Sequence, residues 1–164
     1  MELVYYPHEF LRRQVQPVDL NEPGFDPKEL EKELIETMNA RRGIGLSANQ
    51  VALDKQVFVM GDEQYASMVI NPTVLQYTEE TVKEYEGCLS FPEVFVPVVR
   101  PREILAHFYD SDLNEQTVKL TDYTARVYLH ELDHLLGITM KDRVSNLVWD
   151  KAVRKTRKLQ RKRS

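Results

Sequence analysis

The segment HELDH at residues 130–134 constrains this chain more than any other feature of its sequence. Four residues of a helix turn through about 400°, so His130 and His134 lie on one face, about one turn apart. Two imidazoles in this arrangement can bind one metal ion. Glu131 lies beside them, where it can reach a metal-bound water without becoming a ligand. The segment therefore predicts a catalytic metal site on a helix.

A catalytic metal site needs a third protein ligand and one open position. Two familiar arrangements place that ligand downstream, but position 140 is Met140 and no glutamate follows Glu131. We therefore expect an upstream ligand, and Cys88 in the segment EGCLS at 86–90 is the best candidate. A thiolate with two imidazoles suits zinc or iron and also accepts cobalt or nickel, so the donor set does not select one metal.

The rest of the sequence predicts an α+β fold, with mostly antiparallel sheets packed around the central helix that carries HELDH. Asp26 and Pro27 favour a helix start, and this first helix should end before Gly43. The HELDH helix should run from Thr121 or Asp122 to about Leu136, and Ser145 is suited to cap a third helix. Strand-like runs occupy 57–60, 68–70, 81–85 and 103–109. Turns or strand ends are expected at 71–72, around Pro92 and Pro97, and at 110–112.

Charge is distributed unevenly along the chain. Eight of its 22 basic residues lie in 151–164, where no acidic residue occurs, and residues 1–150 carry a net charge of −12. We expect 1–150 to form a single catalytic domain and 151–164 to form a basic tail that is helical or disordered. Such a tail favours an anionic partner, nucleic acid first, or is simply solvated.

Composition excludes several classes of protein. Cys88 is the only cysteine, so no intramolecular disulfide can form. No apolar run has membrane-spanning length, and MELVYYPHEF lacks the basic start and apolar core of a signal peptide. We expect a cytoplasmic protein without a membrane partner, and a monomer by default.

Three segments together carry a resemblance to a known family. GIGLSANQ at 43–50, EGCLS at 86–90 and HELDH at 130–134 resemble the three motifs of peptide deformylase, in order and at similar spacing. The resemblance extends from Tyr6-Pro7 to about Val144. The chain departs from the family at Ser47-Ala48, where two alanines are usual, and at Phe95, where a basic residue is often found.

This resemblance implies a metal-dependent hydrolase that removes the N-formyl group from the initiator methionine of nascent polypeptides. Cys88, His130 and His134 would hold one divalent metal, Fe²⁺ in the cell, with Zn²⁺, Ni²⁺ or Co²⁺ possible in purified protein. Metal-bound hydroxide would attack the formyl carbon, with Glu131 as general acid and base.

The resemblance also assigns residues that bind the substrate and the developing oxyanion. The side-chain amide of Gln50 and the backbone N–H of Leu89 would stabilise the oxyanion. Gly43 and Gly45 would let an extended peptide backbone approach, although they also fit a plain turn. The expected substrate-binding set is Gly43, Ile44, Gly45, Glu86, Gly87 and Val127. Of these, Ile44 and Val127 either wall a pocket for the methionine side chain or belong to the core.

The sequence leaves more than one role possible for the charged residues near the three motifs. Arg126 lies four residues before His130, and it either pairs with a carboxylate such as Glu86 or contacts the substrate. Glu86 and Arg100 could form a pair that stiffens the ligand loop, as the family suggests. Asp133 should face away from the metal and either orient a neighbour or cap a buried arginine.

Three other functions compete with this interpretation. A metallopeptidase shares the metal and the water nucleophile, but leaves GIGLSANQ unexplained. A cysteine hydrolase would use Cys88 with a histidine base. A nucleic-acid-binding module with a structural metal would explain the basic tail, but not Glu131. The tail and the deformylase reading combine in one hypothesis, in which 145–164 docks on the ribosome near the emerging nascent chain.

Overall fold

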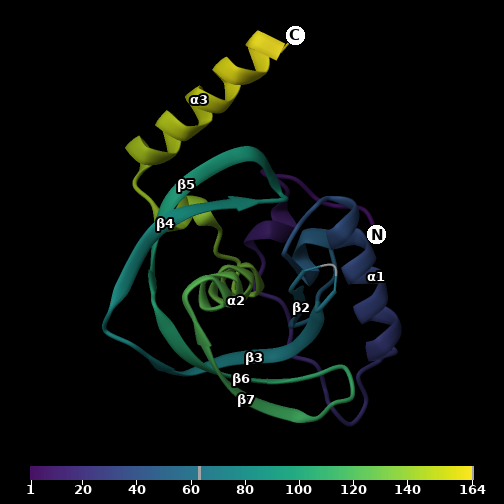
Figure 1. Ribbon diagram of the computed structural model, residues 1–164. Helices are drawn as coiled ribbons and strands as arrows, with labels where there is room; N and C mark the ends of the chain where they lie inside the picture. Colours follow the sequence, from purple (N-terminus) through teal and green to yellow (C-terminus); the bar gives the residue numbers. More distant parts are fainter. Residues whose placement is uncertain (63, 164) are drawn as a thin grey trace.

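Two antiparallel sheets enclose one helix in the computed structural model, which describes residues 1–62 and 64–163 (Figure 1). The larger sheet has the strand order β1-β2-β3-β6-β7, and the smaller one pairs β4 with β5. The strands are β1 (Gly45–Ser47), β2 (Val57–Met60), β3 (Ser67–Tyr77), β4 (Thr81–Cys88), β5 (Phe91–Pro101), β6 (Glu103–Tyr109) and β7 (Glu115–Thr121). The α+β class and the antiparallel pairing expected from the sequence are confirmed.

The helices are α1 (Pro27–Ala40), α2 (Asp122–Leu135) and α3 (Asn146–Arg163), with short 3-10 helices η1 (Glu9–Arg12), η2 (Ala48–Val51) and η3 (Met140–Arg143). The start of α1 is as expected, because the Asp26 carboxylate accepts hydrogen bonds from the N–H groups of Lys28 and Glu29. Leu34 and Met38 bury the inner face of α1 against the larger sheet.

Helix α2 carries HELDH and is buried around most of its circumference, since strands of both sheets wrap round it (Figure 1). On the side of the larger sheet, Tyr128 packs edge-on against Phe58 with ring centroids 5.3 Å apart. Gly137 follows the helix with a φ of +73°, and its N–H bonds to the carbonyl of His134. The predicted end of the helix is therefore correct to within one residue.

Two of the predicted breaks in the strands are wrong. Strand β3 continues through Asn71-Pro72, where its register with β6 shifts, and the Asn71 side chain bonds both the N–H and the carbonyl of Val18. Pro92 and Pro97 lie within β5. A strand that pairs on one side only can hold proline, because proline lacks the N–H that a second partner would need. The expected turn at 110–112 is present.

Helix α3 begins as predicted, with the Ser145 hydroxyl accepting a hydrogen bond from the N–H of Val148. Trp149 is buried against Phe91 of β5, and further along the helix Thr156 and Arg163 bond to Glu93 of the same strand. Helical structure continues from 146 through 163, and the domain boundary at residue 150 stays a prediction. Within the described residues, no helix combines the length and apolar character needed to cross a bilayer.

Candidate metal centre and active site

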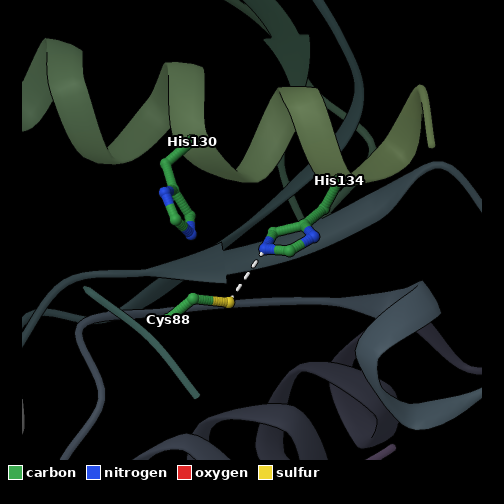
Figure 2. A group of neighbouring side chains, drawn as sticks. All are labelled: Cys88, His130 and His134. Carbon is green, nitrogen blue, oxygen red and sulfur yellow. Dashed lines mark hydrogen bonds between the residues drawn. The ribbon is translucent and has the colours of Figure 1, made fainter. Parts of the chain in front are cut away.

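Cys88, His130 and His134 converge where the end of β4 meets α2 (Figure 2). Each offers one ligand atom, and these atoms lie within 4.8 Å of one another. The two imidazoles project from the same face of α2 with ring centroids 4.9 Å apart, and Nε2 of His134 lies 3.2 Å from Sγ of Cys88. One sulfur and two nitrogens at this separation match the donor set of a zinc or iron site, so these residues fit a single metal ion.

A carboxylate fixes the orientation of the His130 ring. Nδ1 of His130 lies 2.9 Å from Oε2 of Glu86, so a proton on Nδ1 leaves Nε2 as the ligand atom. Burial alone would lower the pKa of His130, but hydrogen bonding to Cys88 and Glu86 raises it well above its usual value. Burial lowers the pKa of His134, which favours the neutral imidazole that binds a metal.

Glu86 is the centre of a buried charge network between α2 and the β4–β5 hairpin. Arg100 donates to both of its carboxylate oxygens, at 2.9 and 3.0 Å, and Arg126 donates to Oε1 at 2.8 Å. Burial by itself would raise the pKa of Glu86, yet its hydrogen bonds with His130 and Arg100 hold that pKa far below its usual range. Glu86 is therefore ionised throughout the physiological pH range.

The two arginines also bind groups beyond Glu86. Arg126 donates to the carbonyls of Val82 and Val98, one on each strand of the hairpin. Arg100 donates to Asp133 at 2.6 Å, so Asp133 caps a buried arginine, one of its two expected roles. Of the alternatives for Arg126, the pairing with Glu86 is the one observed. The network thus holds the Cys88 strand at a fixed place against α2.

Glu131 is buried beside the ligands and bound to Ser47. The Ser47 hydroxyl donates to the Glu131 carboxylate, which joins β1 to α2. Burial raises the pKa of Glu131, a shift that brings a carboxyl group closer to the pH at which it can both take up and release a proton. A raised pKa and a place next to the ligand cluster suit a general acid and base.

Gln50 is positioned with its amide nitrogen towards the ligand cluster. Its Oε1 accepts a hydrogen bond of 2.9 Å from the N–H of Ser47. The opposite end of the amide, Nε2, is therefore directed at Ser90 Oγ, 3.1 Å away, and at Cys88 Sγ, 3.5 Å away. A donor fixed in this way is suited to bind a negatively charged oxygen near the metal.

A cavity of about 630 Å³ opens over the ligand cluster. Its lining contains every expected site residue except His134, which is fully buried beneath it: Gly43, Ile44, Gly45, Gln50, Glu86, Gly87, Cys88, Leu89, Val127, His130 and Glu131. Three segments that are distant in sequence thus meet around one cavity. Ile44 is exposed there, whereas Val127 is buried in its wall.

Sequence reasoning missed two supporting contacts. It noted Ser47 only as a departure from the family motif, but the Ser47 hydroxyl donates to the Glu131 carboxylate. The side-chain amide of Asn49 donates to the carbonyl of His134, which links η2 to the end of α2. Both residues lie inside GIGLSANQ, and a polar residue in a largely apolar, buried segment is the signal that could have found them.

Comparison with known proteins places this geometry in a family. The family described as Polypeptide deformylase matches residues 1–149. The peptide deformylase of Nitrosococcus oceani is 37% identical over 164 residues, covering 98% of this chain and 96% of that protein. That of Borreliella burgdorferi is 34% identical, covering 87% and 86%. The crystal structure of peptide deformylase from Thermotoga maritima superposes with a TM-score of 0.82 at 36% identity, covering 88% of this chain and 97% of that one. The chain belongs to the peptide deformylase family of enzymes.

Proposed function

We propose that this protein hydrolyses the N-formyl group of formyl-methionyl polypeptides in a metal-dependent reaction. The observation that carries the proposal is the cluster of Cys88, His130 and His134, whose ligand atoms lie within 4.8 Å, at the base of the cavity that also contains Glu131 and Gln50. Family membership supports the substrate class. A divalent ion bound there acts as a Lewis acid and makes hydroxide available near neutral pH.

Glu131 moves the proton in this reaction. Its carboxylate accepts the proton of the attacking water and returns it to the nitrogen of the methionine, which leaves as an amine while the formyl group leaves as formate. The Ser47 hydroxyl holds the carboxylate in place, and burial keeps its pKa raised. A general acid and base of this kind typically contributes about 10²- to 10⁴-fold to the rate.

Gln50 and Leu89 stabilise the negative charge that develops on the formyl oxygen. The Gln50 amide has its donor end directed at the ligand cluster, and Leu89 lines the cavity directly after Cys88. Removing one such donor costs about 3 kcal/mol of barrier, so Gln50→Ala should lower kcat by a few hundredfold or less.

The substrate peptide binds in extended form along Gly43 and Gly45, with its methionine side chain between Ile44 and Val127. The cavity supports this placement, because its lining joins 43–45 to the ligand cluster without interruption. Glu86 and Gly87 line the same cavity.

Formate release is the direct test. Wild type loaded anaerobically with Fe²⁺ or Ni²⁺ should release formate from a formyl-Met tripeptide and lose this activity on chelation. Glu131→Ala should retain the metal but lose at least a hundredfold in kcat, whereas Glu36→Ala, a change at an exposed glutamate of α1, should behave as wild type. If the fully loaded wild type cleaves only unformylated peptides, the protein is a metallopeptidase. Metal-free activity abolished by thiol alkylation would indicate a cysteine hydrolase.

We also propose that Fe²⁺ is the metal in the cell, with Zn²⁺, Ni²⁺ or Co²⁺ taking its place in purified protein. The thiolate–imidazole donor set accepts all four ions. Metal analysis of protein purified with and without oxygen tests this, since Fe²⁺ should predominate only in the anaerobic sample. The cytoplasmic location and the monomeric state remain predictions.

Helix α3 is the proposed contact with the ribosome. Five of its basic residues line one groove of the helix surface: Arg154, Arg157, Lys158, Arg161 and Lys162. Phosphate groups of RNA would bind this face, with an affinity that falls steeply with salt. Combined Arg157→Glu and Lys158→Glu changes should weaken ribosome binding at least tenfold, while the exposed Lys83→Glu should not. If wild type, the double variant and Lys83→Glu all bind ribosomes equally at low and moderate salt, the proposed contact is wrong.

A further inference from the structure

Residues 3–6 form a segment that joins the two sheets beside the candidate active site. Leu3 is buried in the core between α1 and the larger sheet. Three positions later, the Tyr6 ring stacks on Phe91 of β5 in the smaller sheet, with ring centroids 5.0 Å apart. Between these two anchors the segment passes close to the cavity, whose lining includes Leu3 and Tyr5.

Two backbone N–H groups of this segment bind residues that lie next to the ligand cluster. The N–H of Val4 donates to the carbonyl of Gln50 at 2.8 Å, and the N–H of Tyr6 donates to the carbonyl of Ser90 at 3.0 Å. Gln50 belongs to η2 and Ser90 to the turn between β4 and β5, so 40 positions of the sequence separate them. Because alternate residues make the two bonds, both carbonyls lie along one edge of the segment. The 3–6 segment therefore ties η2 to this turn.

The two contacts converge on the side chain of Gln50. Its Nε2 atom donates to Ser90 Oγ at 3.1 Å, and Ser90 is the residue whose carbonyl binds the N–H of Tyr6. A glutamine amide carries two hydrogens on Nε2, so the bond to Ser90 leaves the other hydrogen to face the ligand cluster, where Cys88 Sγ lies 3.5 Å away. The direction of that hydrogen depends on where Ser90 lies relative to the Gln50 backbone. The 3–6 segment fixes this relative position.

The two elements that the segment joins are both short. Helix η2 is a single 3-10 turn of four residues, and such helices have poorer hydrogen-bond geometry than α-helices. The connection between β4 and β5 is a tight turn, and the register of the two strands shifts between Gly87 and Cys88. Bonds to a third segment restrict the movement of one element relative to the other. This matters for catalysis, because a displacement of about 1 Å can cost about a hundredfold in rate.

We propose that the N–H groups of Val4 and Tyr6 position the Gln50 amide for the negative charge that develops on the formyl oxygen. This inference rests on the proposed function, in which Gln50 is an oxyanion donor. The cavity lining includes neither Val4 nor Tyr6, so both are positioning residues that act through Gln50. Loss of one of their bonds should lower kcat and leave KM and the metal content unchanged, because the oxyanion forms only in the transition state.

A double-mutant cycle with a formyl-Met tripeptide and the Ni²⁺-loaded enzyme tests this proposal. Val4→Pro removes the N–H that binds Gln50, and it should lower kcat about ten- to a hundredfold. In the Gln50→Ala background the same change should lower kcat less than about threefold, because the side chain that it positions is already absent. Glu2→Pro is the matched control, since Glu2 is an exposed residue just before the segment and this variant should behave as wild type.

A second variant keeps the test decisive if proline at position 4 disturbs the fold. Incorporation of the α-hydroxy acid analogue of valine replaces the Val4 N–H by an ester oxygen and leaves the side chain unchanged. We expect the same kinetic pattern from this ester, with a lower kcat in the wild-type background and almost no further loss in Gln50→Ala.

The outcomes separate this inference from the function on which it rests. Equal losses of kcat in the wild-type and Gln50→Ala backgrounds would mean that Val4 supports the fold rather than Gln50, which overturns the inference alone. An ester variant with wild-type kcat overturns it as well, and so does a loss of metal that accounts for the lost activity. Wild-type kcat in Gln50→Ala overturns both the inference and the oxyanion role of Gln50. Absence of formate from the loaded wild type overturns the proposed function and the inference together.

Discussion

Gly45→Ala should damage the reaction without damaging the fold, because the added methyl group overlaps Glu131. Gly45 lies in β1 without a left-handed φ, so alanine can adopt the same backbone conformation. Its Cβ, however, would lie 2.8 Å from Cδ and 3.0 Å from Cγ of Glu131. Ordinary contacts between such atoms are about 3.5–4.0 Å. The carboxylate must therefore retreat by about 1 Å.

A displacement of this size is enough to prevent the Glu131 carboxylate from transferring a proton efficiently. A displacement of about 1 Å can cost about a hundredfold in rate, because proton transfer needs donor and acceptor within hydrogen-bond reach. The Ser47 hydroxyl, which binds the same carboxylate, would lose its geometry at the same time. We expect kcat for a formyl-Met tripeptide to fall about a hundredfold, with the metal content unchanged.

Steady-state formate release at saturating peptide, combined with metal analysis and urea unfolding, checks this prediction. Gly24→Ala is the control, since its Cβ meets nothing within 4 Å but its φ of +74° is unfavourable for alanine. That variant should lose about 1 kcal/mol of stability and keep its kcat. A Gly45→Ala enzyme with full metal content and kcat within threefold of wild type would refute the reasoning.

Three further predictions concern stability. Arg100→Met should lower the free energy of unfolding by about 3–5 kcal/mol, because it leaves the buried carboxylates of Glu86 and Asp133 with one cation fewer. A loss below about 1 kcal/mol in urea unfolding would contradict this prediction. Trp149→Ala should cost about 3 kcal/mol in the same assay, since Trp149 is buried with Phe91 and Val96, and no loss would mean that α3 does not pack on β5. Burial alone would raise the pKa of Asp142, but hydrogen bonds from Thr139 and Arg12 lower it overall. The ionised Asp142 therefore stabilises the folded protein above about pH 4, and this stabilisation is lost as the pH falls through the folded-state pKa. Asp142→Asn should therefore be less stable than wild type at pH 7, and the difference should shrink steadily as the pH falls below about 4. A difference that stays constant across this range would argue against this role.

Local signals predicted those parts of the fold that local residues determine. Asp26 and Pro27 place the start of α1, and Gly137 the end of α2, because caps depend on a few neighbouring residues. The proline of β3 and those of β5 were wrongly predicted to mark turns or strand ends. Whether a proline ends a strand depends on whether a second strand needs its N–H, and that is decided by the partner strand, elsewhere in the sequence.

The residues of the candidate site also differ in how far the sequence alone can identify them. The spacing of His130 and His134 fixes two candidate ligands within one helix, so the sequence alone identifies them. Cys88 could be named only by eliminating other donors and from the family resemblance, since its approach depends on how β4 meets α2. Ser47 and Glu131 are separated by 84 positions in the sequence, and no local sequence pattern predicts a contact between residues so far apart.

The charge network around Glu86 explains how a ligand from a separate sheet is held in register with a helix. Apolar packing alone leaves two layers free to slide, because it has no preferred direction, whereas a bidentate pair such as Arg100 with Glu86 fixes both distance and angle. The two carboxylates, Glu86 and Asp133, are matched by two buried guanidinium groups, Arg100 and Arg126, so the burial of these ions leaves no uncompensated charge among them. Arg126 bonds both strands of the hairpin, and Glu86 bonds His130. The same interactions that hold β4 and β5 against α2 thus also orient one imidazole towards Cys88.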